Sequence, residues 1–124
     1  MKHLLLTTIA VVLVVGCGPP EPPEVSIHDA AKKGNIEAVK QHLAAGTDVN
    51  AKNWDGWTPL HYAVNRRRKE TAALLIAKGA DVNVLDGGGY TPLDRAIKKN
   101  HTEIADLLRK HGGKTGEELK AEGK

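Results

Sequence analysis

The sequence repeats itself at an interval of 33 residues. Residues 58–61 read Thr-Pro-Leu-His and residues 91–94 read Thr-Pro-Leu-Asp, and the tripeptide Asp-Val-Asn occupies both 48–50 and 81–83. Glycines at 46, 79 and 112 keep the same interval. Because these three series share one spacing, the chain is predicted to consist of tandem units that bury their apolar faces against one another. The residues that define the period are Thr58, Pro59, Leu60, His61, Thr91, Pro92 and Leu93, together with Gly46, Gly79 and Gly112.

Each complete unit contains signals for two helices. Thr58 is suited to accept a backbone hydrogen bond as an N-cap, and Pro59 suits the first helical position, where no backbone donor is needed. Trp57 and Tyr62 are spaced to pack together as a hydrophobic staple across this helix start. A second helix is predicted over about residues 69–78, and the glycine that follows is expected to end it in a left-handed conformation.

With this motif at this spacing, the chain resembles the ankyrin repeat, a β-turn followed by two antiparallel helices. The resemblance covers about residues 25–113 and implies an all-α ankyrin-repeat solenoid of about three helix-turn-helix repeats joined by hairpin loops. The repeats are expected at about 25–53, 54–86 and 87–113. The second helix of the middle repeat is apolar nearly all round, whereas those of the outer repeats are half polar, so the outer repeats are expected to cap the stack.

Three residues depart from the pattern of the family. The turn between the two helices usually contains glycine, as at Gly34, but Arg67 and Asn100 stand at the equivalent positions. Both are expected to adopt left-handed geometry, at a cost of about 1 kcal/mol for Arg67. Asp94 replaces the motif histidine, whose hydrogen bonds normally link neighbouring repeats in this family, so the link is expected to be missing in the last repeat. Asp94 is also placed to form a capping box with Thr91.

The N-terminus carries a predicted export signal over residues 1–16. Lys2 precedes an apolar run from Leu4 to Val15, which is too short for a bilayer-spanning helix of about 20 residues. Gly16 followed by Cys17 resembles the lipobox of bacterial lipoproteins, which implies cleavage before Cys17 and attachment of lipid to its thiol. An ordinary signal peptide with a chance cysteine and an uncleaved anchor are the alternatives.

This resemblance implies a protein anchored on the periplasmic side of a bacterial membrane. Gly18 after the cysteine favours the outer membrane, by analogy with bacterial sorting systems. Residues 17–24 then form the lipidated cysteine and a proline-rich tether, which extends by about 3.1 Å per residue. Residues 114–124 are predicted to be a flexible tail with a turn of helix begun by Thr115 and Glu118.

Composition and spacing narrow the classes of partner and chemistry. The formal net charge of +3 is mild and spread along the chain, so no nucleic-acid partner is expected. One cysteine supplies too few thiolates for a zinc site, and no histidines after the signal are paired at i, i+4, so neither a metal nor a cofactor is expected. Residues 113–115 lack the upstream glycine of a phosphate loop, and no serine or cysteine lies in an activating context. The chain is therefore predicted not to be an enzyme.

The resemblance implies that a partner binds to the hairpin tips and to the exposed face of each first helix. Lys33, Arg66 and Lys99 recur there at the 33-residue interval, so stacking is expected to align them into a positive face that favours an acidic protein. The alternative is that cations near helix C-termini interact with the helix dipole and keep the surface soluble. The predicted partner-binding residues are Trp54, Asp55, Trp57 and Tyr90 on the hairpins and Lys32, Lys33, Asn65, Arg66, Lys98 and Lys99 on the helices, with Trp54 as an aromatic anchor.

Three non-enzymatic functions are consistent with these features. The first is a protein-protein interaction module, a scaffold or adaptor that a lipid anchor tethers to the bacterial envelope. The second is an inhibitor or immunity-type protein that blocks a partner enzyme or toxin, and the third is a docking domain for anionic envelope polymers. The chain is expected to be monomeric. Its partner depends on surface substitutions, because repeat proteins change specificity on an unchanged stack.

Overall fold

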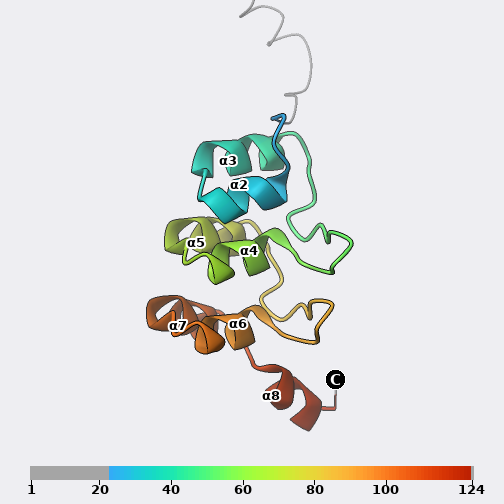
Figure 1. Cartoon of the computed structure of the whole chain (residues 1–124), viewed down its shortest axis with the longest axis vertical. Helices are drawn as coiled ribbons and strands as arrows, with labels where there is room; N and C mark the ends of the chain where they lie inside the picture. The colour runs from blue at the N-terminus through green and yellow to red at the C-terminus, as the bar shows by residue number, and fades with distance from the viewer. Residues whose placement is uncertain (1–22, 124) are drawn as a thin grey trace, which may run out of the picture.

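A computed structural model describes residues 23–123. Helices α2 (Ile27–Lys33) and α3 (Ile36–Ala44) form the first pair, α4 (Pro59–Asn65) and α5 (Lys69–Ala77) the second, and α6 (Pro92–Lys98) and α7 (Thr102–Lys110) the third. The pairs stack in chain order, with long hairpin loops on one side and the short helix α8 (Gly116–Ala121) beneath the last pair (Figure 1). The described residues contain no β-strand. The predicted all-α stack of three repeats is confirmed.

The first helices of the second and third repeats begin as the sequence predicted. Thr58 and Thr91 are the N-caps of α4 and α6, each followed by a proline in the first helical turn, and each forms a capping box with the residue three positions later. The ring centroids of Trp57 and Tyr62 are 4.9 Å apart, so the predicted hydrophobic staple is present. These contacts lie within six consecutive residues, which explains why local sequence was enough to predict them.

The turns between paired helices adopt left-handed geometry in all three repeats. Gly34 has φ 72°, and Arg67 and Asn100 both have φ 59°. The prediction that two non-glycine residues take the glycine conformation is therefore confirmed. The steric cost of this geometry is larger for Arg67 than for Asn100, because asparagine tolerates the left-handed region better than arginine does.

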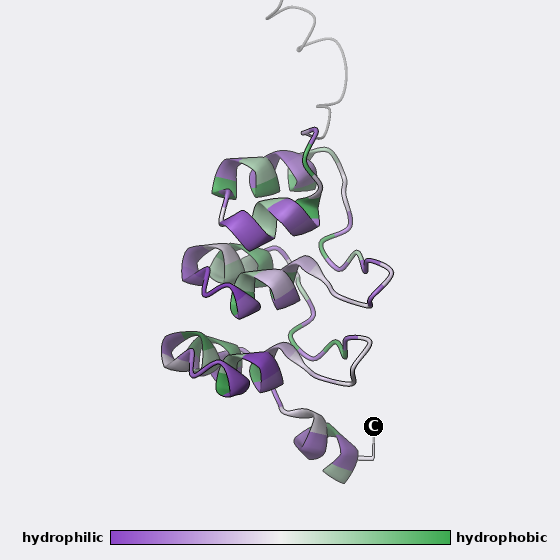
Figure 2. Cartoon of the chain, in the orientation of Figure 1, coloured by the Kyte–Doolittle hydropathy of each residue, from purple (hydrophilic) through white to green (hydrophobic). Residues whose placement is uncertain are grey.

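The core repeats with the sequence. Leu60 and Leu93 in the first helices and Leu75 and Leu108 in the second helices are all at most 1% exposed, and each pair is separated by one 33-residue period. The small residues Ala30, Ala63 and Ala96 are also buried at one equivalent position, where the first helices of successive repeats approach one another. In Figure 2, hydrophobic residues concentrate within and between the helix pairs, while hydrophilic residues cover the outer surface.

Neighbouring hairpins are joined by the recurring Asp-Val-Asn tripeptide. Asp48 accepts the backbone N–H of Asn50 at 2.9 Å, which closes a tight turn, and Asp81 does the same for Asn83. The Asn50 side chain then accepts the N–H of Asp81 at 2.7 Å, and the Asn83 side chain accepts the N–H of Lys114 at 2.8 Å. The motif therefore recurs because each copy makes one turn and one link to the following repeat.

Asp94 makes no link to another repeat, but it makes the equivalent contact to helix α8, which the sequence did not predict. His61 Nε2 lies 3.2 Å from the carbonyl oxygen of Tyr90 in the next repeat. The equivalent Asp94 Oδ2 accepts the backbone N–H of Gly116 at 2.9 Å, at the start of α8. The His61 imidazole meets a carbonyl acceptor, whereas the Asp94 carboxylate can only accept a hydrogen bond. The first turn of α8 supplies the free backbone N–H that this carboxylate needs.

Helix α8 begins at Thr115, which forms a capping box with Glu118. This is the turn of helix that the sequence predicted within residues 114–124. Arg109 of α7 also forms an ion pair with Glu118, with 3.4 Å between Nη1 and Oε1, so α8 contacts both helices of the last repeat.

No helix within residues 23–123 combines the length and apolar character needed to cross a bilayer. The predicted signal over residues 1–16, Cys17 and most of the predicted tether lie outside the described residues.

Candidate functional site

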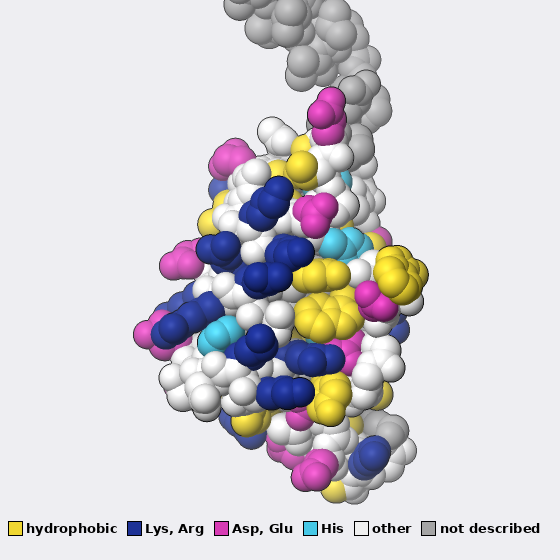
Figure 3. All heavy atoms as spheres, in the orientation of Figure 1, with side chains coloured by type: hydrophobic (Ala, Val, Ile, Leu, Met, Phe, Trp, Pro, Cys, Tyr) yellow, Lys and Arg dark blue, Asp and Glu magenta, His cyan; other side chains and the backbone are white. Residues whose placement is uncertain are grey.

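The C-terminal ends of the three first helices lie next to one another along the stack. Arg68 donates a hydrogen bond from Nε to the carbonyl oxygen of Lys32 at 3.1 Å, which joins the end of α2 to the start of α5. His101 Nδ1 lies 2.9 Å from the carbonyl oxygen of Val64, which joins α4 to the start of α7. We define the basic face as the cations at these helix ends, which form a row across α2, α4 and α6 in Figure 3: Lys32, Lys33, Arg66, Arg67, Lys98 and Lys99.

The cations of the basic face are exposed and unpaired within the described chain. All are exposed except Lys32, which is half-buried, as is the neighbouring Asn65. The ion pairs within residues 23–123 involve five other cations, at Lys40, Lys69, Arg95, Arg109 and Lys114. The stacking therefore brings together positive charges that the rest of the fold does not neutralise.

Acidic residues recur at the starts of the second helices. Glu37, Glu70 and Glu103 each stand in the first turn of a second helix, where the helix dipole favours a negative charge. Two of them pair with lysines of second helices, Glu37 with Lys40 and Glu103 with Lys69. The basic face is therefore locally positive although the net charge of the chain is small, because its own cations have no ion-pair partner within residues 23–123.

Aromatic residues on the hairpins border the basic face. Trp54 lies at a hairpin tip with 93% of its surface exposed, beside the exposed Asp55, and Tyr90 is 41% exposed. Trp57 is half-buried, and its backbone N–H donates to the side chain of Asn53 at 2.9 Å. Lys98 Nζ lies 5.5 Å from the centre of the Tyr90 ring, so Tyr90 adjoins the basic face.

An ion pair that the sequence analysis missed holds these aromatic residues in place. Arg95 Nη2 lies 2.6 Å from Asp86 Oδ2, and the side chain of Asp86 is completely buried. The Arg95 guanidinium lies 4.9 Å from the Trp57 ring and 4.6 Å from the Tyr90 ring, between the two. Arg95 therefore connects the hairpin of the middle repeat to that of the last repeat.

The 33-residue period contained the signal for this pair. Asp86 and Arg95 stand one period after Asn53 and Tyr62, and Asn53 Nδ2 donates to the Tyr62 hydroxyl at 2.8 Å. Asn53 Oδ1 also accepts two backbone N–H groups of its hairpin, as Asp86 Oδ1 does in the next. The two pairs are the same contact made with different chemistry, a neutral amide with a phenol and a carboxylate with a guanidinium.

The environment of Asp86 favours its ionised form. Desolvation by burial opposes ionisation of this carboxyl, but hydrogen bonds from the Tyr90 N–H, Arg95 and the Gly88 N–H outweigh it and lower the pKa of Asp86. The carboxylate therefore stays charged and keeps Arg95 in place between the two rings.

Histidine rings make hydrogen bonds within and between the repeats. His28 Nε2 lies 2.7 Å from the carbonyl oxygen of Ala51, and His42 Nε2 lies 2.6 Å from that of Val25. His61 is completely buried and bridges Thr58 to Tyr90. Within residues 23–123, no group of three or more His, Cys, Asp or Glu side chains is placed to hold a metal ion.

Acid should destabilise the stack through His61. Burial removes solvent from the imidazole and lowers the pKa of His61 below 6.5, despite the opposing bond to the Tyr90 carbonyl. The unfolded chain therefore binds more protons, so the contribution of His61 to stability is present above about pH 6.5 and is lost as the pH falls toward its folded pKa, by at most about 1.4 kcal/mol per pH unit. Urea unfolding of wild type and His61→Gln from pH 7.5 to 5 should show their stability difference narrowing. A difference that is constant across this range contradicts the assignment.

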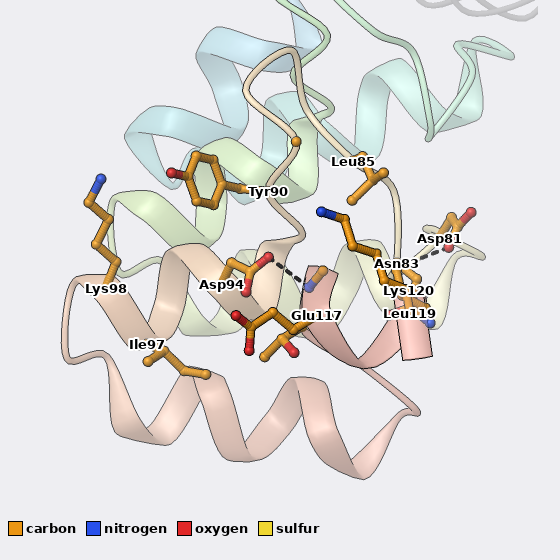
Figure 4. Close-up of a pocket in the computed structure, with 13 residues that line it drawn as sticks. Asp81, Asn83, Leu85, Tyr90, Asp94, Ile97, Lys98, Glu117, Leu119 and Lys120 are labelled. Carbon is orange, nitrogen blue, oxygen red and sulfur yellow. Dashed lines mark hydrogen bonds between the residues drawn. The ribbon is translucent and has the colours of Figure 1, made fainter. Parts of the chain in front are cut away.

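A pocket of about 810 Å³ lies between α6, the last hairpin and α8 (Figure 4). Its apolar lining includes Leu85, Tyr90 and Ile97, and the carboxyl groups of Asp94 and Glu117 lie near its centre. Within residues 23–123, only α8 lies against this face of α6, and it covers only part of it. Tyr90 and Lys98 line this pocket and also border or belong to the basic face, so the two surfaces are continuous.

Comparison with known proteins agrees with this geometry. A family model described as ankyrin repeats (3 copies) matches residues 27–118. The chain is 46% identical over 50 residues to protein phosphatase 1 regulatory subunit 12A of Mus musculus, which covers 40% of this chain and 5% of that protein. It is 43% identical over 49 residues to acyl-CoA-binding domain-containing protein 4 of Oryza sativa subsp. japonica, and this match covers 40% of this chain and 15% of that protein. It is 36% identical over 73 residues to the mitochondrial disaggregase of Homo sapiens, and this match covers 56% of this chain and 10% of that protein. The chain therefore spans only a small part of each relative.

Proposed function

Because the chain belongs to the ankyrin-repeat family, whose repeats are protein-protein interaction modules and generally not enzymes, we propose that it binds an acidic protein partner through the basic face and the adjoining hairpin aromatics. The observation that carries this proposal is the row of exposed cations, which recurs with the repeat and has no ion-pair partner within residues 23–123. Complementary charge across such a surface steers association and excludes unsuitable partners.

The aromatic residues supply the apolar part of the proposed contact. Trp54 is almost fully exposed and has no structural contact that requires a large ring at the hairpin tip, which suits an anchor that becomes buried in a complex. Trp57 and Tyr90 support the fold through Arg95 and also present ring surface beside the basic face. Aromatic rings are enriched at the centre of protein interfaces, and lysines are found mainly on their polar rim, so the rings would supply the centre of this contact and the cations its edge.

We further propose that the chain is a scaffold or adaptor held on the periplasmic side of a bacterial membrane by lipid on Cys17. The supporting sequence is the basic residue and short apolar run before Gly16 and Cys17. Several acyl chains on one cysteine, at about 0.8 kcal/mol for each buried CH₂, hold a small protein stably in a bilayer. The proline-rich residues after Cys17 lead to α2, at the opposite end of the stack from α8 (Figure 1). Attachment at the end of the stack leaves its lateral basic face available to a partner.

The test compares three full-length forms in a bacterial host: wild type, Cys17→Ser, and the triple variant Lys33→Gln, Arg66→Gln and Lys99→Gln. Wild type should incorporate a clickable fatty acid, sediment with the envelope and crosslink to a partner protein. Cys17→Ser should lose the fatty acid label and leave the envelope fraction. The triple variant should keep the label and lose about 90% of the crosslinked partner, because three exposed ion pairs together contribute about tenfold to affinity.

A matched control places the same charge change on the second helices, at Lys40, Lys78 and Lys110, which are also exposed. This control should crosslink like wild type, and circular dichroism should show both triple variants folded. Equal crosslinking by the two triple variants would exclude the basic face as the binding surface. Retention of the fatty acid label by Cys17→Ser would exclude lipid attachment at that residue.

A further inference from the structure

The cations of the basic face have a spacing that selects among partner conformations. Lys33, Arg66 and Lys99 occupy one position of the 33-residue period, at the ends of α2, α4 and α6. Adjacent packed helices lie about 8–10 Å apart, and the bonds of Arg68 to Lys32 and of His101 to Val64 keep successive helix ends in register. Within the basic face, these three equivalent cations therefore recur about every 8–10 Å along the stack, each with a second cation beside it in the sequence.

An extended polyproline II segment matches this spacing. It has three residues per turn and rises about 3.1 Å per residue, so every third side chain lies on the same edge, about 9.3 Å from the last. A β-strand places same-face side chains about 6.8 Å apart, which is too short. An α-helix reaches about 10.5 Å with i, i+7 pairs, but its diameter is about 10–12 Å with side chains. The polyproline II repeat of about 9.3 Å therefore lies within the spacing of about 8–10 Å between adjacent helices, and the helical repeat of about 10.5 Å lies above it. Lys98 Nζ lies 5.5 Å from the centre of the Tyr90 ring, so the last repeat presents a cation and a ring side by side.

The aromatic border suits the other edges of such a segment. Proline-rich polyproline II segments bind surfaces lined with aromatic rings, because the segment is already ordered before it binds. Tyr90 is partly exposed beside Lys98, and Trp57 and Tyr90 are held at fixed positions by the guanidinium of Arg95 between them. Acidic side chains on one edge can thus meet the cations while prolines on the next edge contact the rings.

We propose that the partner presents an extended, proline-rich acidic segment with an acidic residue at every third position, bound along the stack across all three repeats. This inference rests on the proposed binding function of the basic face and adds the conformation and the charge spacing of the partner. It predicts that the arrangement of charges in a ligand matters, and not only their number.

The experiment uses dye-labelled peptides and the full chain, with binding measured by fluorescence anisotropy at low and physiological salt. The first peptide contains four Glu-Pro-Pro units. The second has the same composition, with its four glutamates together at one end, so that it keeps the charge and the proline content but loses the spacing. The third is a helical peptide with glutamate at every seventh position. The spaced proline peptide should bind about tenfold more tightly than the other two.

Variants of the full chain identify the surface responsible. The triple substitution of Lys33, Arg66 and Lys99 by Gln should reduce the affinity for the spaced peptide to that of the block peptide, and the matched substitution of Lys40, Lys78 and Lys110 should not. Equal affinity for the spaced and block peptides, or tighter binding of the helical peptide, overturns the proposed partner conformation and leaves the basic face as a binding surface. Failure of all three peptides to bind, in a protein whose basic face still captures its envelope partner, likewise overturns only the conformation. If the triple variant keeps both its peptide binding and its partner capture, both proposals are overturned.

Discussion

Replacing Asp86 by Asn and Arg95 by Tyr in the same molecule should leave the protein nearly as stable as wild type, although each single substitution should lower the free energy of unfolding by about 2–4 kcal/mol. The double substitution recreates in the last repeat the pair that the middle repeat makes with Asn53 and Tyr62. In the single variant Asp86→Asn, the half-buried guanidinium of Arg95 loses its carboxylate partner. In Arg95→Tyr, the completely buried carboxylate loses its cation.

The measurement is a double-mutant cycle from urea unfolding, followed by tryptophan fluorescence, because Trp57 lies against Arg95. We expect a coupling energy of about 4 kcal/mol or more in favour of the double variant, because the two single losses sum to about 4–8 kcal/mol and the double variant should lose almost nothing. If the stability losses of the two single variants simply add in the double variant, the Asn–Tyr and Asp–Arg pairs are not interchangeable. The last hairpin would then depend on the charge of the ion pair. A matched pair of substitutions, Asn53→Asp and Tyr62→Arg, tests the same exchange in the opposite direction.

Substitution of Val64 by Asn should cost about 3–5 kcal/mol, whereas Ile97→Asn should cost only about 1 kcal/mol, although the two residues are separated by one period. Val64 is completely buried beneath the following repeat, so an amide there loses apolar contact and has no assured hydrogen-bond partner. Ile97 is 48% exposed, because no other repeat within residues 23–123 covers it.

Urea unfolding at neutral pH measures both costs, and each variant is the control for the chemical change in the other. Because each repeat is stabilised only by its neighbours, damage at Val64 should also broaden the transition by uncoupling the repeats, and Ile97→Asn should leave its slope unchanged. Equal losses for the two variants would mean that α8 or another segment buries Ile97 in solution.

Much of the fold was predictable because its determinants are local and repeated. The capping boxes of Thr58 and Thr91, the left-handed Arg67 and Asn100 and the staple of Trp57 with Tyr62 each involve residues close in sequence. Such contacts depend on backbone geometry and side-chain reach, which a short stretch of sequence determines. The period then showed how often these local structures recur, and the polarity of the second helices showed which repeat lies inside the stack.

The errors and omissions lie where one repeat meets the next. The link at Asp94 was predicted to be absent because the motif histidine was missing, but the first turn of α8 supplies a donor that a carboxylate can accept. The ion pair of Asp86 with Arg95 was missed because its two residues lie nine positions apart, and its role depends on rings from two different hairpins. The equivalent pair in the middle repeat is Asn53 with Tyr62, so the contact recurs with different residue types and a search for identical residues does not find it.

The sequence by itself therefore determined the repeat, its helix boundaries, its turn geometry and the order of the stack, because these depend on neighbours within one period. The tertiary structure alone decided which charges remain unpaired and which rings are held rigid. It also decided where apolar surface stays open. Those properties depend on distances between residues about 33 positions apart, and only the packing of one repeat on the next sets them.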